Sequence, residues 1–419
     1  MMSTQHKKII LLSSIGGALE FFDFTIYALF ATYISQAFFP HNDALVSLLK
    51  TFGVFALGYL ARPLGGIVFG HFGDKKGRRY AFTLSVLFMA VSTLLIGLLP
   101  TYQTWGSFAP LLLILLRLLQ GFSVGGEIPA ATVFTFEHVP ELYRGVAIAT
   151  IFMCITLGNA IAGGLGLILS KTLSHQTMAM WGWRIPFIVG FFLGIISYIL
   201  RKKALETPIF QEMEQRHLLV KIPLATILKQ AKQSIIVSFF LTALSATTVF
   251  LFLYLPTYLT KILNYHVTSS YLMSTISFIV LAVFGPLFGW LSDKIGRRKL
   301  LIPGCLLSII IGFILFKLLI IHNQWIVWLF GIVMGILVAM VNGVYATTIC
   351  EQFPSKLRAS GMGLSYNLGF ALFGGLAPLV ITLLIKTSHD NLVPYYFFIS
   401  CSVLTLLASF FIKKKSGVV

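Results

Sequence analysis

Two acidic side chains stand inside the first apolar stretch of the sequence. Glu20 and Asp23 are three residues apart and Tyr27 follows four residues later, so all three share one face if the stretch is helical. A charged group at the centre of a bilayer costs about 3 kcal/mol on insertion scales, and such groups normally line an internal pathway. We therefore expect this face to point into the protein.

A second apolar stretch carries complementary polar groups. Arg117, Gln120 and Glu127 are spaced by three and seven residues, which places them on one side of a helix. Arg117 keeps its charge under all relevant conditions, whereas a carboxyl in an apolar site can take up a proton near neutral pH. We expect Asp23 to pair with Arg117, so that protonation of Asp23 frees Arg117 to bind a substrate carboxylate. Glu20 and Glu127 are further candidates for proton coupling.

A static role is the alternative for these ions, because buried pairs can simply fix helix packing. That alternative stays open for the Asp23–Arg117 pair and is stronger for Glu20 and Glu127. Softer candidates for substrate contact are polar or aromatic residues within apolar stretches, each of which could instead serve helix packing. They are Tyr27, Arg117, Gln120, Asn159, Thr248, Tyr254, Tyr366 and Asn367.

Membrane-spanning helices must position these groups. Of the 419 residues, 57% are hydrophobic and 11% are charged, and the mean hydropathy is +0.91. A soluble domain has roughly 25% charged residues. The four cysteines lie singly in apolar segments, so neither a disulfide framework nor a metal site is expected. We predict an all-α membrane protein that is not an enzyme, since no nucleophile and base set appears.

Twelve apolar stretches are long enough to span a bilayer. The longest polar interval separates six from six, which predicts an N-terminal six-helix bundle (1–200), a cytoplasmic linker (201–233) and a C-terminal six-helix bundle (234–419). The stretches lie at about 10–38, 46–72, 80–100, 107–136, 145–170, 184–200, 234–260, 269–291, 300–320, 324–349, 358–385 and 394–412.

Basic residues orient the chain. Most of the 31 Lys and Arg residues fall in loops on the side of the N-terminus, so the positive-inside rule places both termini in the cytoplasm. The net charge of +18 is thereby explained without nucleic-acid binding. Arg62 is expected near the cytoplasmic end of the second span, which leaves Arg117 as the one clear arginine within the membrane.

Two motifs recur in both halves. "GHFGDKKGRR" (70–79) returns as "GWLSDKIGRR" (289–298), and "EHVPELYRG" returns as "EQFPSKLRASG" with Glu137 and Arg144 matching Glu351 and Arg358. Such repeats indicate two six-helix units in parallel orientation. Asp74 and Asp293 in the first motif stand where an acid can cap the following helix and pair with an arginine from a neighbour.

The sequence resembles the major facilitator superfamily, and within it the metabolite:proton symporters of proline/betaine, α-ketoglutarate, citrate and shikimate type. The resemblance rests on "LEFFDFTIY", "RPLGGIVFGHFGDKKGRR", "RLLQGFSVGGE", "WGWRIPF", "ETPIF" and "GLSYNLGFALFGGLAP". It implies two pseudo-symmetric bundles, residence in the bacterial inner membrane, and contacts that latch the bundles together when the cytoplasmic side is closed. The implied gate residues are Asp74, Arg78, Arg79, Asp293, Arg297, Arg298, Glu137, Arg144, Glu351 and Arg358.

The expected function is proton-coupled import of a small zwitterionic or anionic metabolite by alternating access. Proline or betaine-like solutes are favoured over di- and tricarboxylates, because only one intramembrane arginine is clear. Import of α-ketoglutarate or citrate stays open, as does a drug or metabolite antiporter, although "TLGNAIAGGLGLIL" lacks the proline common in exporters. We expect a monomer in the lipid bilayer with no cofactor and H⁺ as coupling ion, and Na⁺ is not excluded.

The family's osmosensing members carry a long C-terminal coiled coil, whereas this sequence stops at Val419. We therefore expect no osmotic gating by that device.

Overall fold

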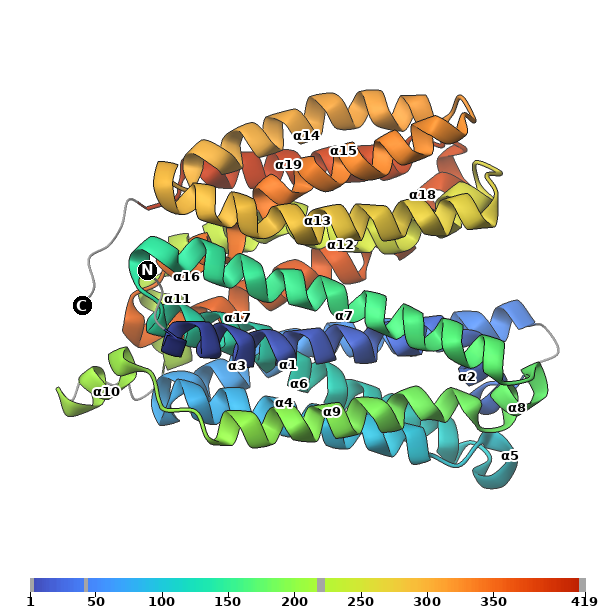
Figure 1. Cartoon of the computed structure of the whole chain (residues 1–419), viewed down its shortest axis with the longest axis horizontal. Helices are drawn as coiled ribbons and strands as arrows, with labels where there is room; N and C mark the ends of the chain where they lie inside the picture. Colours follow the sequence, from blue (N-terminus) through green and yellow to red (C-terminus); the bar gives the residue numbers. More distant parts are fainter. Residues whose placement is uncertain (1–3, 41–43, 217–222, 414–419) are drawn as a thin grey trace.

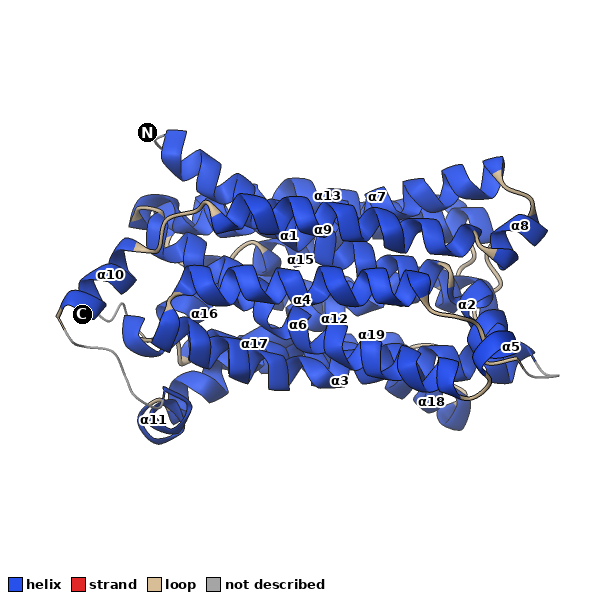
Figure 2. Cartoon of the chain, turned by 90° about the horizontal axis from the view of Figure 1, so that it is seen from below, coloured by secondary structure: helices blue, strands red, loops and turns tan. Residues whose placement is uncertain are grey.

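Long helices dominate the computed structural model, which describes residues 4–40, 44–216 and 223–413 and has no strand within those ranges (Figure 2). The long helices are α1 (Thr4–Leu29), α3 (Ala44–Lys76), α4 (Arg78–Leu98), α6 (Phe108–His138), α7 (Arg144–Thr172), α9 (Ile185–Lys202), α12 (Lys232–Lys261), α13 (Val267–Ile295), α14 (Arg298–Leu319), α15 (Gln324–Asn342), α17 (Arg358–Gly369), α18 (Ala377–Ser388) and α19 (Val393–Phe410).

Short elements connect or extend these helices. They are α2 (Ala31–Phe38), α5 (Tyr102–Trp105), η1 (Glu141–Tyr143), α8 (His175–Met180), η2 (Gly182–Arg184), α10 (Pro208–Gln215), α11 (Pro223–Gln230), α16 (Tyr345–Glu351), η3 (Ser355–Leu357) and the π-helix η4 (Phe370–Gly375).

The predicted all-α membrane fold is confirmed. Ten segments of the described chain are long and apolar enough to cross a membrane. The first expected span corresponds to α1 followed by α2, and the eleventh to α17, η4 and α18 in succession. Each of these two spans is thus divided, which a hydropathy window does not reveal.

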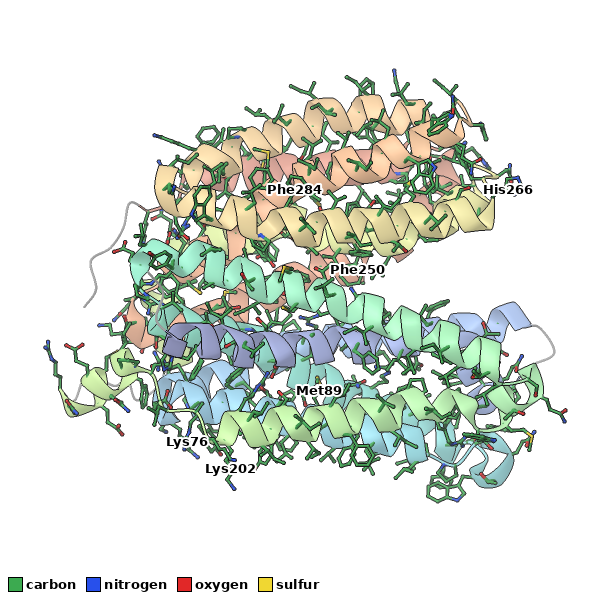
Figure 3. The ribbon with its side chains drawn as sticks, viewed as in Figure 1. Lys76, Met89, Lys202, Phe250, His266 and Phe284 are labelled. Carbon is green, nitrogen blue, oxygen red and sulfur yellow. The ribbon has the colours of Figure 1, made fainter. Side chains whose placement is uncertain are left out.

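Two groups of helices form the molecule (Figure 1). Helices α1 to α9 gather in one group, the N-terminal group, and α12 to α19 in the other, the C-terminal group, whose helix α17 packs both on α12 of its own group and on α3 of the first. The start of α1 and the end of α19 lie at the same end of the molecule, here called the terminal end. Lys76 and Lys202 lie toward this end (Figure 3), and α7 and α13 diverge toward the opposite end.

Glycines allow the two groups to touch backbone to backbone near the terminal end. A Cβ on Gly66 of α3 would lie 2.3 Å from the carbonyl oxygen of Gly363 on α17. A Cβ on Gly145 of α7 would lie 2.4 Å from the carbonyl oxygen of Gly289 on α13. Small residues let membrane helices approach closely, so both helix crossings require glycine at these positions.

An aromatic contact joins the groups farther from the terminal end. Phe250 of α12 lies between them (Figure 3), and its ring is 5.0 Å from that of Tyr59 on α3. The π-helix η4 packs beside this pair, since a Cβ on Gly374 would lie 2.4 Å from the Phe250 ring. Single π-turns within α-helices are often found at functional sites.

Candidate functional site

A cavity of about 30 Å³ lies between the two helix groups. It has room for roughly two waters, so a solute the size of an amino acid needs its walls to separate. None of the described residues that line it is charged, and six are aromatic. The aromatic residues are Phe21, Phe152, Phe278, Tyr345, Tyr366 and Phe370.

Two of the residues predicted to contact substrate line this cavity. Asn159 of α7 does so, and its side-chain oxygen accepts a hydrogen bond of 2.6 Å from the Thr25 hydroxyl on α1. Tyr366 of α17 stacks on Phe370, with ring centroids 4.4 Å apart, and lies 6.5 Å from Tyr345. The cavity wall therefore presents aromatic faces and a few neutral polar groups.

Arg117 lies in a separate buried cluster formed by α1, α3, α4 and α6. The guanidinium carbon is 3.5 Å from the centroid of the Tyr27 ring, and the group donates to the Gln120 side chain. Gln120 in turn donates to the Thr93 hydroxyl at 2.9 Å. The structure thus brings together the predicted faces of the first and fourth spans at Tyr27, Arg117 and Gln120, and none of the three lines the cavity.

Glu20 and Asp23 are in α1, but their side chains lie outside the part of the structure that is described. Their pairing with Arg117 therefore stays a prediction. The helix itself passes Arg117, because Phe24 and Tyr27 both have their rings within 6 Å of its guanidinium carbon.

Glu127 does not join the Arg117 cluster, contrary to the expectation from helical spacing. Its carboxylate forms a two-pronged ion pair with Arg201 at the end of α9, with one N–O distance of 2.7 Å, and both side chains are fully buried. The Ser85 hydroxyl donates to the same carboxylate at 3.0 Å. Ten residues separate Glu127 from Arg117, about 15 Å along a helix, so sharing a side does not bring them together.

Replacing Glu127 by glutamine is expected to destabilise the protein without removing coupling. The change leaves Arg201 buried without its anion, which costs about 3–5 kcal/mol. Thermal unfolding of the purified protein should show a lower midpoint, while proton-driven uptake per folded molecule stays near the wild-type value. Loss of coupling with unchanged stability would instead make Glu127 part of the proton pathway.

The prediction that Arg62 lies near the cytoplasmic end of the second span is wrong. It lies in the middle of α3, fourteen residues before Lys76 and so about 21 Å from the terminal end of that helix, and it is completely buried. Its guanidinium carbon is 5.6 Å from the Phe370 ring, and its Nε donates to the Asn367 side chain at 3.4 Å. A second arginine therefore lies deep in the protein, beside a residue that lines the cavity.

The remaining predicted substrate contacts lie away from the cavity lining. The Thr248 hydroxyl donates to the Leu244 carbonyl of its own helix at 2.7 Å. Tyr254 is buried with its ring 6.5 Å from that of Tyr258. Asn367 bridges the helix groups, because its amide nitrogen donates to the Gly125 carbonyl at 2.7 Å.

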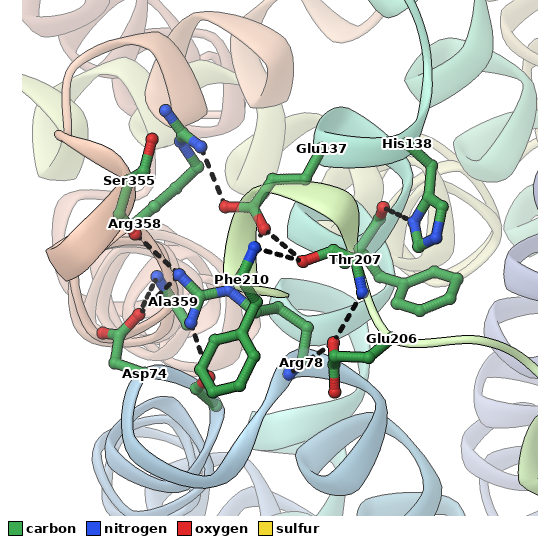
Figure 4. Close-up of polar contacts among 12 residues, drawn as sticks. Asp74, Arg78, Glu137, His138, Glu206, Thr207, Phe210, Ser355, Arg358 and Ala359 are labelled. Carbon is green, nitrogen blue, oxygen red and sulfur yellow. Dashed lines mark hydrogen bonds and ion pairs between the residues drawn. The ribbon is translucent and has the colours of Figure 1, made fainter. Parts of the chain in front are cut away.

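Two aspartates join the helix groups at the terminal end. The Asp74 carboxylate accepts hydrogen bonds from the backbone N–H groups of Ala359 (3.2 Å) and Ser360 (2.8 Å) at the start of α17 (Figure 4). Asp293 does the same at the start of α7, accepting from Gly145 (2.8 Å) and Val146 (3.0 Å). Each acid thus caps a helix of the opposite group and not, as expected, the helix that follows it. Carboxylates are stabilised there by the helix dipole.

Glu137 is the centre of an ionic network that we call the latch, formed with Arg78, Arg358 and Thr207 (Figure 4). Its carboxylate lies 3.1 Å from Nε of Arg78 and 2.8 Å from Nη1 of Arg358, and it accepts from the Thr207 hydroxyl at 2.9 Å. Arg358 comes from the C-terminal half, so the network crosses between the helix groups. The Glu137 side chain is fully buried, so its negative charge has to be stabilised by the two arginines.

The ion pairs of the second repeat stay within one helix group. Arg297 contacts Asp293 at 2.8 Å and Glu351 at 3.0 Å, all from the C-terminal half. Arg144 donates to the Phe136 carbonyl at 3.0 Å in its own half. Arg79 donates to the Ala204 carbonyl, and Arg298 to the carbonyls of Phe410 and Ile412.

Residues just after α9 complete this end of the molecule and were missed by sequence reasoning. Glu206 accepts from the backbone N–H groups of Arg78 (3.0 Å) and Arg79 (3.1 Å), and so caps α4. Burial raises the pKa of the Glu206 carboxyl, and the N–H groups of Thr207, Arg79 and Arg78 oppose that rise. The "ETPIF" motif, which contains Glu206 and Thr207, was the available signal.

The sequence and the fold are both similar to those of known transporters. The family model of the Major Facilitator Superfamily matches residues 13–378 and 235–416. A citrate-proton symporter of Klebsiella pneumoniae is 34% identical over 96% of this chain and 91% of its own. A proline/betaine transporter of Salmonella typhimurium is 31% identical over 98% and 84%. The solved proton:xylose symporter XylE superposes with a TM-score of 0.80 at 16% identity, covering 97% of this chain and 94% of that one.

Proposed function

The chain belongs to the major facilitator superfamily, and on that premise we propose that it imports a small zwitterionic metabolite together with protons. The observation that carries the substrate class is the cavity: six aromatic side chains and no charged one among the described residues line it. Aromatic faces attract a substituted ammonium group. A tricarboxylate would need several cations where this lining offers none.

Alternating access accounts for the contacts at the terminal end, which we take to be cytoplasmic. The latch and the two aspartate caps hold the helix groups together there. Inward opening requires that Arg358 leave Glu137 and that the start of α17 leave Asp74. The protein is proposed to work as a monomer in the bacterial inner membrane, with both termini in the cytoplasm.

Coupling is assigned to Asp23 and Arg117, with Glu20 as a second acid. Arg117 is buried, with 1% of its surface exposed, and lies beside Tyr27 of α1. Both acids precede Tyr27 in the same helix, by four and seven residues. Protonation of Asp23 weakens its hold on Arg117. Because Glu127 pairs with Arg201, Asp23 and Glu20 of α1 are the acids that we assign to coupling with Arg117.

Import of di- or tricarboxylates is the second candidate. The relative from Klebsiella pneumoniae is a citrate-proton symporter, and Arg62 adds a buried cation beside Phe370. Only a comparison of substrates separates the two. An exporting antiporter is less well supported, since the relative from Klebsiella pneumoniae and the solved XylE are both named as symporters.

Uptake into proteoliposomes tests the proposal. Under an imposed inward proton gradient we expect accumulation of L-proline or glycine betaine, and little uptake of citrate or α-ketoglutarate. A matched sodium gradient should be without effect. Citrate uptake without zwitterion uptake would select the second candidate, and uptake that ignores the proton gradient for every compound would refute proton symport.

A further inference from the structure

The C-terminal wall of the cavity is a continuous aromatic stack. Tyr345, Tyr366 and Phe370 follow one another, with ring centroids 6.5 Å and 4.4 Å apart and planes inclined by 17° and 28°. All three are buried, and Phe152 of the opposite helix group meets Tyr345 edge-on at 5.5 Å. Such a wall offers π-faces to a compact cation entering between the helix groups.

Arg62 faces this stack from the other helix group. Its guanidinium carbon lies 5.6 Å from the Phe370 ring and 5.3 Å from the Tyr59 ring, and the side chain is fully buried. Its Nε donates to a neutral amide oxygen, that of Asn367, over a long distance of 3.4 Å. A carboxylate is a stronger acceptor than an amide for a guanidinium group, and it accepts two parallel bonds.

Asn367 is arranged so that it can give up this contact. Its amide nitrogen is held by the carbonyls of Gly125 at 2.7 Å and Gly363 at 2.8 Å. The oxygen is therefore the part of the side chain that can be replaced as partner of Arg62 without loss of these two bonds. Arg62 and Asn367 belong to different helix groups, so a ligand that bridges them also acts on the interface.

We propose that Arg62 binds the carboxylate of the zwitterionic substrate, in place of the Asn367 oxygen, while the ammonium group lies against the stack of Tyr345, Tyr366 and Phe370. This inference rests on the proposed function and says which side chains select the substrate. Arg62 selects solutes that carry a carboxylate, and the aromatic stack selects those with a substituted ammonium group. On this assignment Arg62 takes the carboxylate that the sequence pattern assigns to Arg117, and Arg117 serves proton coupling.

Glycine betaine and choline provide the test, because both carry a trimethylammonium group and only betaine carries a carboxylate. Wild-type protein in proteoliposomes should bind betaine at least about 100-fold more tightly than choline, measured by competition against labelled betaine exchange. Arg62→Gln should weaken betaine binding about 100-fold and leave choline binding unchanged, so that the preference disappears. Phe370→Leu should weaken both ligands about tenfold, because it removes a ring that both ammonium groups share.

Each outcome separates this inference from the proposed function. Proton-driven uptake of zwitterions by the wild type, with an unchanged betaine-to-choline ratio in Arg62→Gln, overturns the role of Arg62 and leaves the import function standing. Uptake of citrate alone by the wild type overturns both. If Arg62→Gln does not fold, as judged by thermal unfolding, Arg62→Lys replaces it. That variant should weaken betaine about tenfold and not choline, and unchanged betaine binding would overturn the proposal.

Discussion

Replacing Asp23 by asparagine is expected to abolish uphill uptake while sparing exchange. Entry of one net positive charge with the solute gains about 2.3 kcal/mol per 100 mV, enough for roughly 50-fold accumulation. Asparagine cannot take up the proton, so accumulation in the variant should fall to the external concentration. Exchange of labelled for unlabelled solute needs no net proton movement and should continue. Both rates are measured in the same proteoliposomes.

The matched control for this variant is Asp390→Asn, which removes an acid that follows α18 and lies outside the cluster of α1 and α6. It should accumulate solute like the wild type. Full accumulation by Asp23→Asn would remove Asp23 from the coupling pathway and favour a purely structural role for its pairing with Arg117.

Replacing Glu137 by glutamine is expected to open the terminal end of the protein. The carboxylate is fully buried between Arg78 and Arg358, and its loss leaves two buried cations without their shared anion. Breaking such a network costs about 3–5 kcal/mol in the closed form, a shift of roughly 10²- to 4 × 10³-fold toward the open form. Active uptake should fall accordingly, because the outward-facing form becomes rare.

Cys350 reports this opening directly. It is completely buried in α16, and its carbonyl oxygen accepts from Nε of Arg358 at 3.2 Å. A thiol reagent applied from the terminal side should label Cys350 in Glu137→Gln and spare it in the wild type, with labelled sites identified by mass spectrometry. Glu141→Gln, at an exposed position on η1, is the control and should behave as wild type. Equal labelling of all three proteins would refute the role of the latch.

The membrane fold was predictable because the sequence patterns that indicate it occur along the whole chain and in both of its halves. Apolar stretches of membrane length and the two loop motifs are local features, and they indicate the spans and the internal duplication. The aspartates of the loop motifs were correctly placed at helix ends. Their partners were not, because Asp74 meets Ala359 and Ser360 from the other half of the chain, and no local pattern indicates such a contact.

The candidate site was less predictable, for a reason that the arginines illustrate. Arg62 and Arg201 look like ordinary basic residues near the ends of spans, yet both are completely buried. A membrane-embedded carboxylate such as Glu127 needs a cation, which was a signal that another arginine had to be near. Which arginine reaches it depends on how α9 packs against α6, and a helical wheel contains no such information. The close approach of η4 to Phe250 is likewise a contact between distant parts of the chain, which no local pattern indicates.

Proton-coupled import is tested by measuring the proton movement that the solute alone drives. Proteoliposomes are prepared at equal pH and potential on both sides in weak buffer, and glycine betaine or L-proline is added outside. We expect the external medium to become alkaline as solute enters the vesicles with protons. Choline should produce no such change, and neither should solute added to the Asp23→Asn variant. Entry of solute at the wild-type rate with no change in external pH would contradict proton-coupled import.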